Sequence, residues 1–176
     1  MNHNEILDSY MNHNEILAEA SGGALTANEV KNLQLRKAII VDIDGTVATH
    51  YDAAGKQIRE HHDYARVGED LPVPEIIQLV QLYETLGYHI VIVSGRMDHC
   101  RRETIDWLIE NNVEFDELYM RKFKDFRPDD IVKSEIYDLW IKEKYNVELV
   151  LDDRDRVVKM WRARGLKVLQ VADGDF

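Results

Sequence analysis

Runs of apolar residues alternate with amphipathic segments from about residue 36 to the end of the chain. AIIVDI (38–43) and YHIVIVSG (88–95) are nearly continuous apolar runs, a pattern typical of strands buried on both faces of a sheet. PEIIQLVQLYETLG (74–87) instead repeats apolar residues at helical spacing, with a proline in its first turn and a glycine at its end. These are the ordinary start and stop signals of a helix.

Extended along the chain, this pattern predicts alternating strands and helices. The expected strands cover residues 38–43, 88–95, 115–120, 147–153 and 166–172, and the expected helices cover residues 74–87, 99–112, 129–145 and 154–165. Such alternation favours a parallel sheet covered on both faces. The expected fold class is therefore α/β, a Rossmann-like doubly wound parallel sheet of about five strands. We expect the rings of Trp107, Trp140 and Trp161, which fall in these helices, to pack onto the sheet.

The first 35 residues follow a different pattern. MNHNEIL occurs at 1–7 and again at 11–17, and Ser21-Gly22-Gly23 indicates a flexible joint. Residues 26–35 have the spacing of a short helix capped by Thr26. We therefore predict an N-terminal extension over residues 1–35, to which we assign no function, and one folded domain over residues 36–176.

Composition narrows the function classes. No apolar stretch approaches the roughly 18 residues of a membrane span, and the N-terminus lacks the basic and apolar regions of a secretory signal. The single cysteine, Cys100, excludes an internal disulfide and fits a reducing compartment, so we expect a cytoplasmic protein without membrane contact. A net charge of −11 argues against non-specific coating of nucleic acid. It still allows a local basic patch that holds one chain end.

Polar residues gather at the carboxyl ends of the expected strands. The first strand ends in DIDGT (42–46), the second in SGR (94–96) and the fourth in DDR (152–154), while Asp129 and Lys133 begin the helix after the third. In a parallel sheet these ends meet at one rim, where ligands bind. A single strand-end aspartate often caps a turn, and Ser94 alone could cap a helix. Caps do not explain the whole ordered set.

The acids in this set predict a metal site. Asp42 and Asp44 are two residues apart, so both can face the same side of an extended segment. Carboxylates that close repel each other unless a proton or cation intervenes, and Asp152 and Asp153 add more negative charge. A hard divalent cation with oxygen ligands relieves this repulsion, and Mg²⁺ is the usual choice where phosphate also binds.

The order of the motifs resembles the haloacid dehalogenase superfamily of phosphotransferases. Its four motifs correspond here to DIDGT (42–46), VSGR (93–96), Lys133 in DDIVK (129–133) and LDDR (151–154). A closer resemblance is to the 3′-phosphatase domain of phage polynucleotide kinase/phosphatases, through GYHIVIVSGR (87–96), RPDDIVKSEI (127–136), LDDRDRVVKMWR (151–162) and QVADGDF (170–176). This resemblance implies a magnesium-dependent phosphatase that removes 3′-phosphates from DNA or RNA ends through an aspartyl-phosphate. It would act in the host cytoplasm if phage-encoded.

The resemblance also implies a role for each motif residue. Asp42 would be the nucleophile and Asp44 the general acid and base. Arg96 and Lys133 would neutralise charge on the transferring phosphoryl group. A family arginine in the first loop falls on Arg59, although that loop is longer here, with extra residues around 50–57. The implied sets are catalytic Asp42, Asp44, Ser94, Arg96 and Lys133; substrate-binding Gly45, Thr46, Gly95, Arg59, Asp129 and Arg154; and metal-binding Asp42, Asp44, Asp152 and Asp153.

The expected partner is a 3′-phosphorylated nucleic acid end. YMRKFKDFR (119–127) interleaves basic and aromatic residues beside the rim, a pattern that suits phosphates and bases, although a solvated loop has the same composition. Only about 25 residues separate DIDGT from the next helix, so we expect a minimal cap and an open site. Two alternatives stay open: a small-molecule phosphatase acting on nucleotides or sugar phosphates, and a non-catalytic module that binds phosphate ends. A homodimer is common among proteins of this size, but this is only a base rate, and the sequence does not reveal the oligomeric state.

Overall fold

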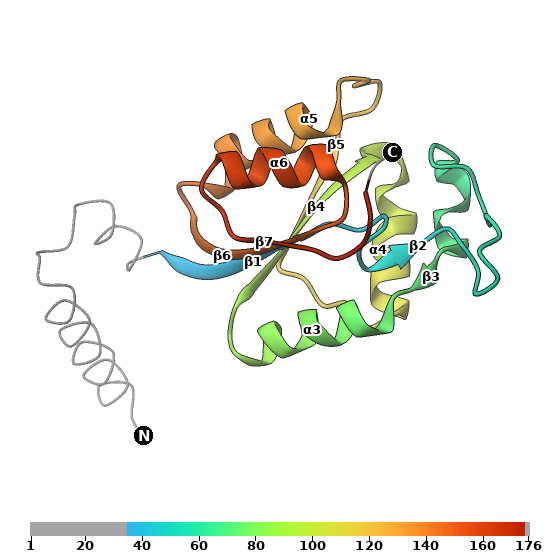
Figure 1. Cartoon of the computed structure of the whole chain (residues 1–176), viewed down its shortest axis with the longest axis horizontal. Coiled ribbons are helices and arrows are strands. Elements are labelled where there is room, and N and C mark those ends of the chain that lie inside the picture. Colours follow the sequence, from blue (N-terminus) through green and yellow to red (C-terminus); the bar gives the residue numbers. More distant parts are fainter. Residues whose placement is uncertain (1–34, 175–176) are drawn as a thin grey trace, which may run out of the picture. The chain divides into compact units, whose positions relative to one another are not determined.

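The computed structural model describes residues 35–174, which form alternating strands and helices (Figure 1). In chain order the elements are β1 (Arg36–Val41), β2 (Ala48–Thr49), the 3₁₀ helix η1 (Tyr64–Glu69), β3 (Leu71–Pro72), α3 (Pro74–Thr85), β4 (His89–Met97), the 3₁₀ turn η2 (Asp98–Cys100), α4 (Arg101–Glu110), β5 (Glu117–Arg121), α5 (Asp129–Ile136), the π-helical turn η3 (Tyr137–Ile141), β6 (Tyr145–Asp152), α6 (Asp155–Ala163) and β7 (Val168–Gln170).

The central sheet has five strands in the order β5-β4-β1-β6-β7, and every neighbouring pair is parallel. β1 lies in the middle, so its residues pair on both sides: Ile39 is in register with Ile90 of β4 and with Leu149 of β6. This confirms the predicted parallel five-stranded α/β fold. The carboxyl ends of β1, β4 and β6 therefore lie side by side.

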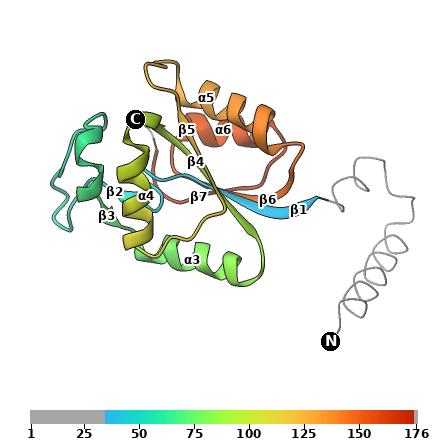
Figure 2. The same cartoon turned by 180° about the vertical axis from the view of Figure 1, so that it is seen from behind.

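The apolar runs are buried on both faces because alternate residues of each strand enter different cores. Ile39 and Val41 of β1 pack in one core with residues of α3 and α4, including Trp107. Ala38 and Ile40 pack in the other core with residues of α6, including Trp161. Figure 2 shows α3 and α4 on one side of the sheet and α5 and α6 on the other, which is the doubly wound arrangement.

The structure corrects two predictions on the α5 side. The helix expected over 129–145 ends as the π-turn η3 at Ile141, because Tyr145 already pairs with Arg36 in the sheet. Trp140 on that turn does not pack onto the sheet: it is 58% exposed and its ring stacks on Tyr119. Trp107 and Trp161 are buried as expected.

A small insert stands where a cap would be. Residues 48–72 contain the antiparallel pair β2–β3 and the helix η1, and no larger domain, within the described residues. This agrees with the expected minimal cap. The N-terminal extension predicted over residues 1–35, with its expected helix at 26–35, lies outside the described residues apart from its last residue, and the domain boundary stays a prediction. Between residues 35 and 174, the longest helices are too short or too polar to cross a membrane.

Candidate active site

Most of the predicted site residues meet at the carboxyl-end rim of the sheet and line one cavity of about 660 Å³. The predicted residues that do not line it are Gly45, Thr46, Arg59, Ser94 and Asp152. Asp42 and Asp44 follow β1, Arg96 lies at the end of β4, Lys133 comes from α5, and Asp153 follows β6. All five side chains line this cavity. The fold thus brings together residues that are more than 100 positions apart in the chain.

Asp42 belongs to a buried cluster of three carboxylates and one cation. Lys133 forms an ion pair with Asp42, with 2.9 Å between Nζ and Oδ1, and donates a hydrogen bond to Asp152 Oδ2 at 2.8 Å. Asp152 also accepts from the indole N–H of Trp161 at 3.2 Å. Asp153 lines the cavity, whereas Asp152 lies behind it against Lys133 and Trp161. Asp42 and Asp153 are therefore the acids of this cluster that face the cavity.

This cluster fits a divalent cation. Oxygen atoms of Asp42, Asp152 and Asp153 lie within 4.8 Å of one another, and all three residues are buried. Burial and the neighbouring acids raise the pKa of Asp42, although Lys133 opposes them. Burial and the charge of Asp152 raise the pKa of Asp153 to about 6. One lysine does not neutralise three buried carboxylates, so a hard cation with oxygen ligands would stabilise the charged cluster.

A second cluster holds the carboxylate of Asp44. Arg59 donates to it at 2.9 Å, and Arg96 donates at 2.8 to 3.1 Å through two nitrogens. Burial raises the pKa of Asp44, but the charge and hydrogen bonds of Arg96 and the charge of Arg59 outweigh it and hold the pKa well below its usual range. Asp44 is therefore ionised at neutral pH. With its carboxylate engaged by arginines, its backbone carbonyl is the group left for the predicted metal.

Asp70 fixes the two arginines from behind. Its fully buried carboxylate accepts from Arg59 Nε and Nη2 and from Arg96 Nη2, each at 2.6 Å. The backbone carbonyl of Asp70 accepts from the indole of Trp107 at 2.8 Å, which ties the start of β3 to α4. Two guanidinium groups therefore share two carboxylates, and the charges balance.

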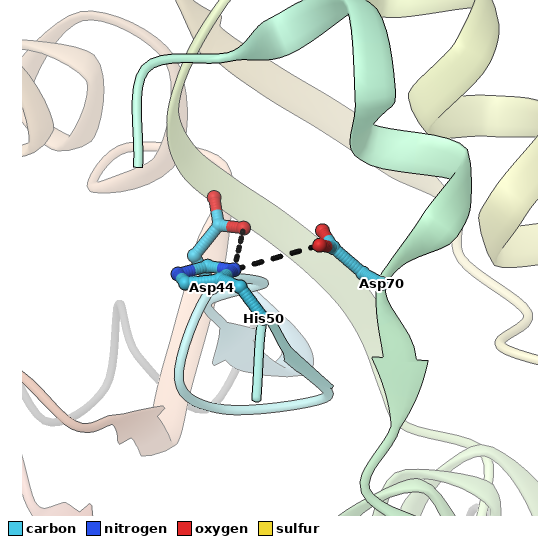
Figure 3. Close-up of side chains that lie close together, drawn as sticks. All are labelled: Asp44, His50 and Asp70. Atoms are coloured by element: carbon cyan, nitrogen blue, oxygen red, sulfur yellow. Dashed lines mark ion pairs between the residues drawn. The ribbon is translucent and has the colours of Figure 1, made fainter. Parts of the chain in front are cut away.

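His50 lies beside these carboxylates. Figure 3 shows its ring with Nδ1 directed at both, 3.7 Å from Asp44 Oδ1 and 3.5 Å from Asp70 Oδ1. Within the described part of the chain, this buried nitrogen has no hydrogen-bond partner. Asp44, His50 and Asp70 have the donor atoms of a metal site, but the arginines already occupy both carboxylates, so a cation there would face like charge.

Asp129 anchors a third cluster at the start of α5. Its carboxylate accepts from Arg121 at the end of β5 and from Arg154 after β6. A side chain on Gly95 would clash with this carboxylate, because a Cβ there would lie 2.6 Å from Asp129 Oδ1. Glycine at position 95 thus allows α5 to approach β4 closely. Gly95, Asp129 and Arg154 all line the cavity.

The turn after β1 depends on Gly45. Its φ is +82°, and a Cβ would overlap the carboxylate of Asp153, so both conformation and space require glycine. Thr46 is buried, its amide donates to Ile43 O at 3.1 Å, and its hydroxyl has no partner among the described residues. Ser94 lies within β4, where its hydroxyl accepts from the amide of Arg96 at 3.2 Å. It is therefore no helix cap.

The sequence pattern predicts the motif residues at the rim, but it does not predict the contacts of Asp70 with the two arginines or the position of His50 beside the carboxylates. Asp70 lies 11 residues after Arg59, in a loop whose path the pattern does not predict. Only the basic and aromatic character of residues 119–127 pointed to Arg121. The catalytic, substrate-binding and metal-binding roles themselves stay predictions.

Residues 36–176 match the family model described as the polynucleotide kinase PNKP phosphatase domain. The chain belongs to this family. A curated relative, a protein named as a putative bifunctional polynucleotide kinase/RNA ligase from Autographa californica nuclear polyhedrosis virus, is 33% identical over 129 residues, which are 72% of this chain and 18% of that protein.

Two solved structures resemble this PNKP-type phosphatase domain closely. They are titled as the Pnkp1/Rnl/Hen1 complex and the Pnkp1/Rnl/Hen1 RNA repair complex. Both share 34% identity and cover 81% of this chain, with TM-scores of 0.76 and 0.75 and coverage of 48% and 44% of their own chains. The chain thus spans less than half the length of these relatives. The family match identifies residues 36–176 as a phosphatase domain of the haloacid dehalogenase type.

Proposed function

We propose that this domain is a magnesium-dependent phosphatase that removes 3′-phosphates from nucleic acid ends through an aspartyl-phosphate on Asp42. The observation that carries the proposal is the separation of two carboxylates two residues apart. Asp42 is held by Lys133 beside the buried acids, whereas Asp44 is held by Arg59 and Arg96 on the other side. The two acids thus occupy different electrostatic environments, as two different roles require.

Asp42 is the nucleophile in this proposal. Its carboxylate oxygen attacks phosphorus, the bond between phosphorus and the 3′ oxygen breaks, and that oxygen leaves with a proton. Lys133 supports the attack because its charge opposes the effect of burial on Asp42 and favours the ionised form, and because it places positive charge beside the transferring phosphoryl group. A Mg²⁺ ion held by Asp42, Asp153 and the carbonyl of Asp44 would supply further positive charge for the phosphate oxygens.

Asp44 handles the protons. In the second step a water attacks phosphorus, Asp44 accepts its proton, and inorganic phosphate leaves while the carboxylate of Asp42 is restored. While both arginines hold Asp44, its low pKa makes it a weak base. An incoming phosphate attracts Arg96, which lines the cavity, whereas Arg59 is buried outside its lining. Phosphate binding would draw Arg96 from Asp44, which then carries the proton delivered to the 3′ oxygen in the first step.

The nature of the substrate rests on the family and on the shape of the cavity. The relatives are named for polynucleotide kinase, RNA ligase and RNA repair, which supports an RNA end at least as strongly as a DNA end. The cavity is not covered by a large cap in the described residues, so a long chain can leave it. A cytoplasmic location and a homodimer stay predictions.

Phosphate release from matched oligonucleotides tests the proposal. RNA and DNA oligonucleotides with a 3′-phosphate, a 5′-phosphate or a 2′,3′-cyclic phosphate are compared with free nucleotides and sugar phosphates, with and without EDTA. We expect Mg²⁺-dependent release from 3′-phosphate ends, loss of release in Asp42→Asn, and normal release in Asp106→Asn, an exposed acid on α4. Preference for a free metabolite would instead favour the small-molecule phosphatase, and EDTA-resistant release would reject the metal.

A further inference from the structure

Aromatic rings line one side of the cavity in an unbroken series. His62 lies 6.2 Å from Tyr64, Tyr64 lies 5.5 Å from His99, and His99 lies 5.1 Å from Phe123, measured between ring centroids. His61 continues the series beyond His62 at 6.3 Å. We call these five residues the aromatic wall: His61, His62, Tyr64, His99 and Phe123, all of which line the cavity. The catalytic steps described above use none of them.

The wall joins three segments that are distant in the sequence. His61, His62 and Tyr64 belong to the insert after β1, His99 belongs to η2 after β4, and Phe123 belongs to the loop after β5. Two of the contacts are edge to face, with interplanar angles of 79° between Tyr64 and His99 and 65° between His99 and Phe123, and the contacts of His62 with His61 and Tyr64 are tilted. Edge-to-face contact leaves ring faces without a parallel partner. A flat aromatic ligand can therefore add to the wall by stacking.

The loop that carries Phe123 is held in place by its backbone. Arg121 donates to the carbonyls of Asp125 and Arg127 and to that of Gly95 on β4. Asp98 accepts from the backbone amide of Phe123 at 2.9 Å. The main chain of residues 121–127 is therefore fixed, while its aromatic side chains remain available.

Those side chains are exposed in a way that folding does not explain. Phe123 is 55% exposed and Phe126 is 81% exposed, and both line the cavity. Lys124 lies between them, with its ammonium 5.3 Å from the Phe123 ring. Neither Lys124 nor Arg156, a second cation of the cavity wall, has an ion-pair partner within residues 35–174. Exposed aromatics next to unpaired cations match a chain of bases joined by phosphates.

We propose that the aromatic wall and Phe126 bind the nucleobases of the last one or two nucleotides, so that the site selects unpaired 3′ ends. This inference rests on the proposed function and names the part of the substrate that is recognised. A cavity of about 660 Å³ has the volume of a small-ligand site, which limits it to very few nucleotides. In a blunt duplex every base but the last is stacked on both faces, and the last is stacked on one face and paired with its partner. A base that has left the duplex therefore presents more free ring surface to the wall.

Truncation of one ring tests the wall without disturbing the fold. Phe123→Ala and Phe126→Ala remove exposed side chains outside the two buried cores, and urea unfolding would verify their stability. The matched control is Leu139→Ala, a residue of η3 that is 63% exposed and does not line the cavity. For an unpaired 3′-phosphorylated oligonucleotide we expect each phenylalanine variant to raise KM about tenfold with kcat unchanged. The control should match the wild type.

The substrate arm removes the base instead of the ring. We expect the KM of the wild type to be higher by a similar factor when the terminal nucleotide of this oligonucleotide is abasic. For the abasic substrate, Phe123→Ala should raise KM little further. The same end in a blunt duplex should be a poorer substrate than an overhang.

Equal KM values for intact and abasic ends, or equal KM values for Phe123→Ala and wild type, would overturn this inference while leaving the phosphatase activity standing. Absence of release from every oligonucleotide would instead overturn the proposed function and the inference together.

Discussion

Replacement of Asp70 by asparagine probes the charge balance of the cluster that holds Asp44. The carboxylate of Asp70 is fully buried and accepts three hydrogen bonds of 2.6 Å from Arg59 and Arg96. Asparagine keeps the shape of the side chain but removes its charge, and its amide group would face guanidinium donors. Two buried arginines would then share the single charge of Asp44.

The expected loss follows from the cost of an unpaired buried charge. Removal of one partner of a buried ion pair costs about 3–5 kcal/mol. Because the amide oxygen of the Asp70→Asn variant can still accept a hydrogen bond, we expect the lower end, about 3 kcal/mol. With a urea m-value of about 2 kcal/mol/M for a domain of this size, the unfolding midpoint should fall by about 1.5 M. A typical stability of about 5–15 kcal/mol leaves the variant folded at zero urea.

Urea unfolding followed by tryptophan fluorescence measures this loss. The matched control is Glu69→Gln, the preceding residue, which removes an exposed ion pair with Arg66 and should leave the midpoint unchanged. We also expect Asp70→Asn to lose most phosphatase activity, since Arg59 and Arg96 would no longer be fixed at Asp44. A midpoint as high as that of Glu69→Gln would refute the idea that Asp70 balances the two arginines.

Three further changes test other parts of the site. Gly95→Ala places a methyl group against Asp129, so phosphate release should fall by roughly 100-fold through misplacement of that residue; release at the wild-type rate would show that α5 can move away freely. Mg²⁺ should raise the thermal midpoint of the wild type. The Asp153→Asn variant should have a higher midpoint than the wild type without metal, because one repelling carboxylate is gone, and Mg²⁺ should change its midpoint little. An equal Mg²⁺-induced shift in the wild type and the variant would argue against metal binding by this cluster. Burial raises the pKa of Cys100, which lowers its thiolate fraction at any given pH, so this single thiol should react slowly with a disulfide reagent at about pH 8 and rapidly in denaturant; fast reaction of the folded protein would contradict its burial.

Much of the fold follows from local pattern. Continuous apolar runs such as 38–43 and 88–95 can only be buried on both faces, and their alternation with helices leaves a doubly wound parallel sheet as the natural solution. Element ends were less predictable. The helix expected over 129–145 ends early because Tyr145 pairs with Arg36, more than 100 residues away, and no local signal reports such a contact.

The same distinction between local pattern and long-range contact applies to the site residues. Strand-end residues such as Asp42 and Asp153 could be placed because strand direction alone brings them to one rim. Asp70 and His50 could not, because their positions depend on how the insert folds back over β1. The exposed surface of Trp140 was mispredicted for a related reason: helical periodicity does not anticipate the π-turn on which it lies.

The hydrogen bonds from Arg121 to the main chain of residues 121–127 affect which substitutions the loop can accept. Since the loop is held through carbonyl oxygens, its shape does not depend on which side chains it carries at positions 123 and 126. The residues at positions 123 and 126 can therefore be substituted without moving the groups that perform the reaction. Under the proposed base contacts, preference for one kind of end over another can therefore change in evolution or by design without a change in the catalytic residues.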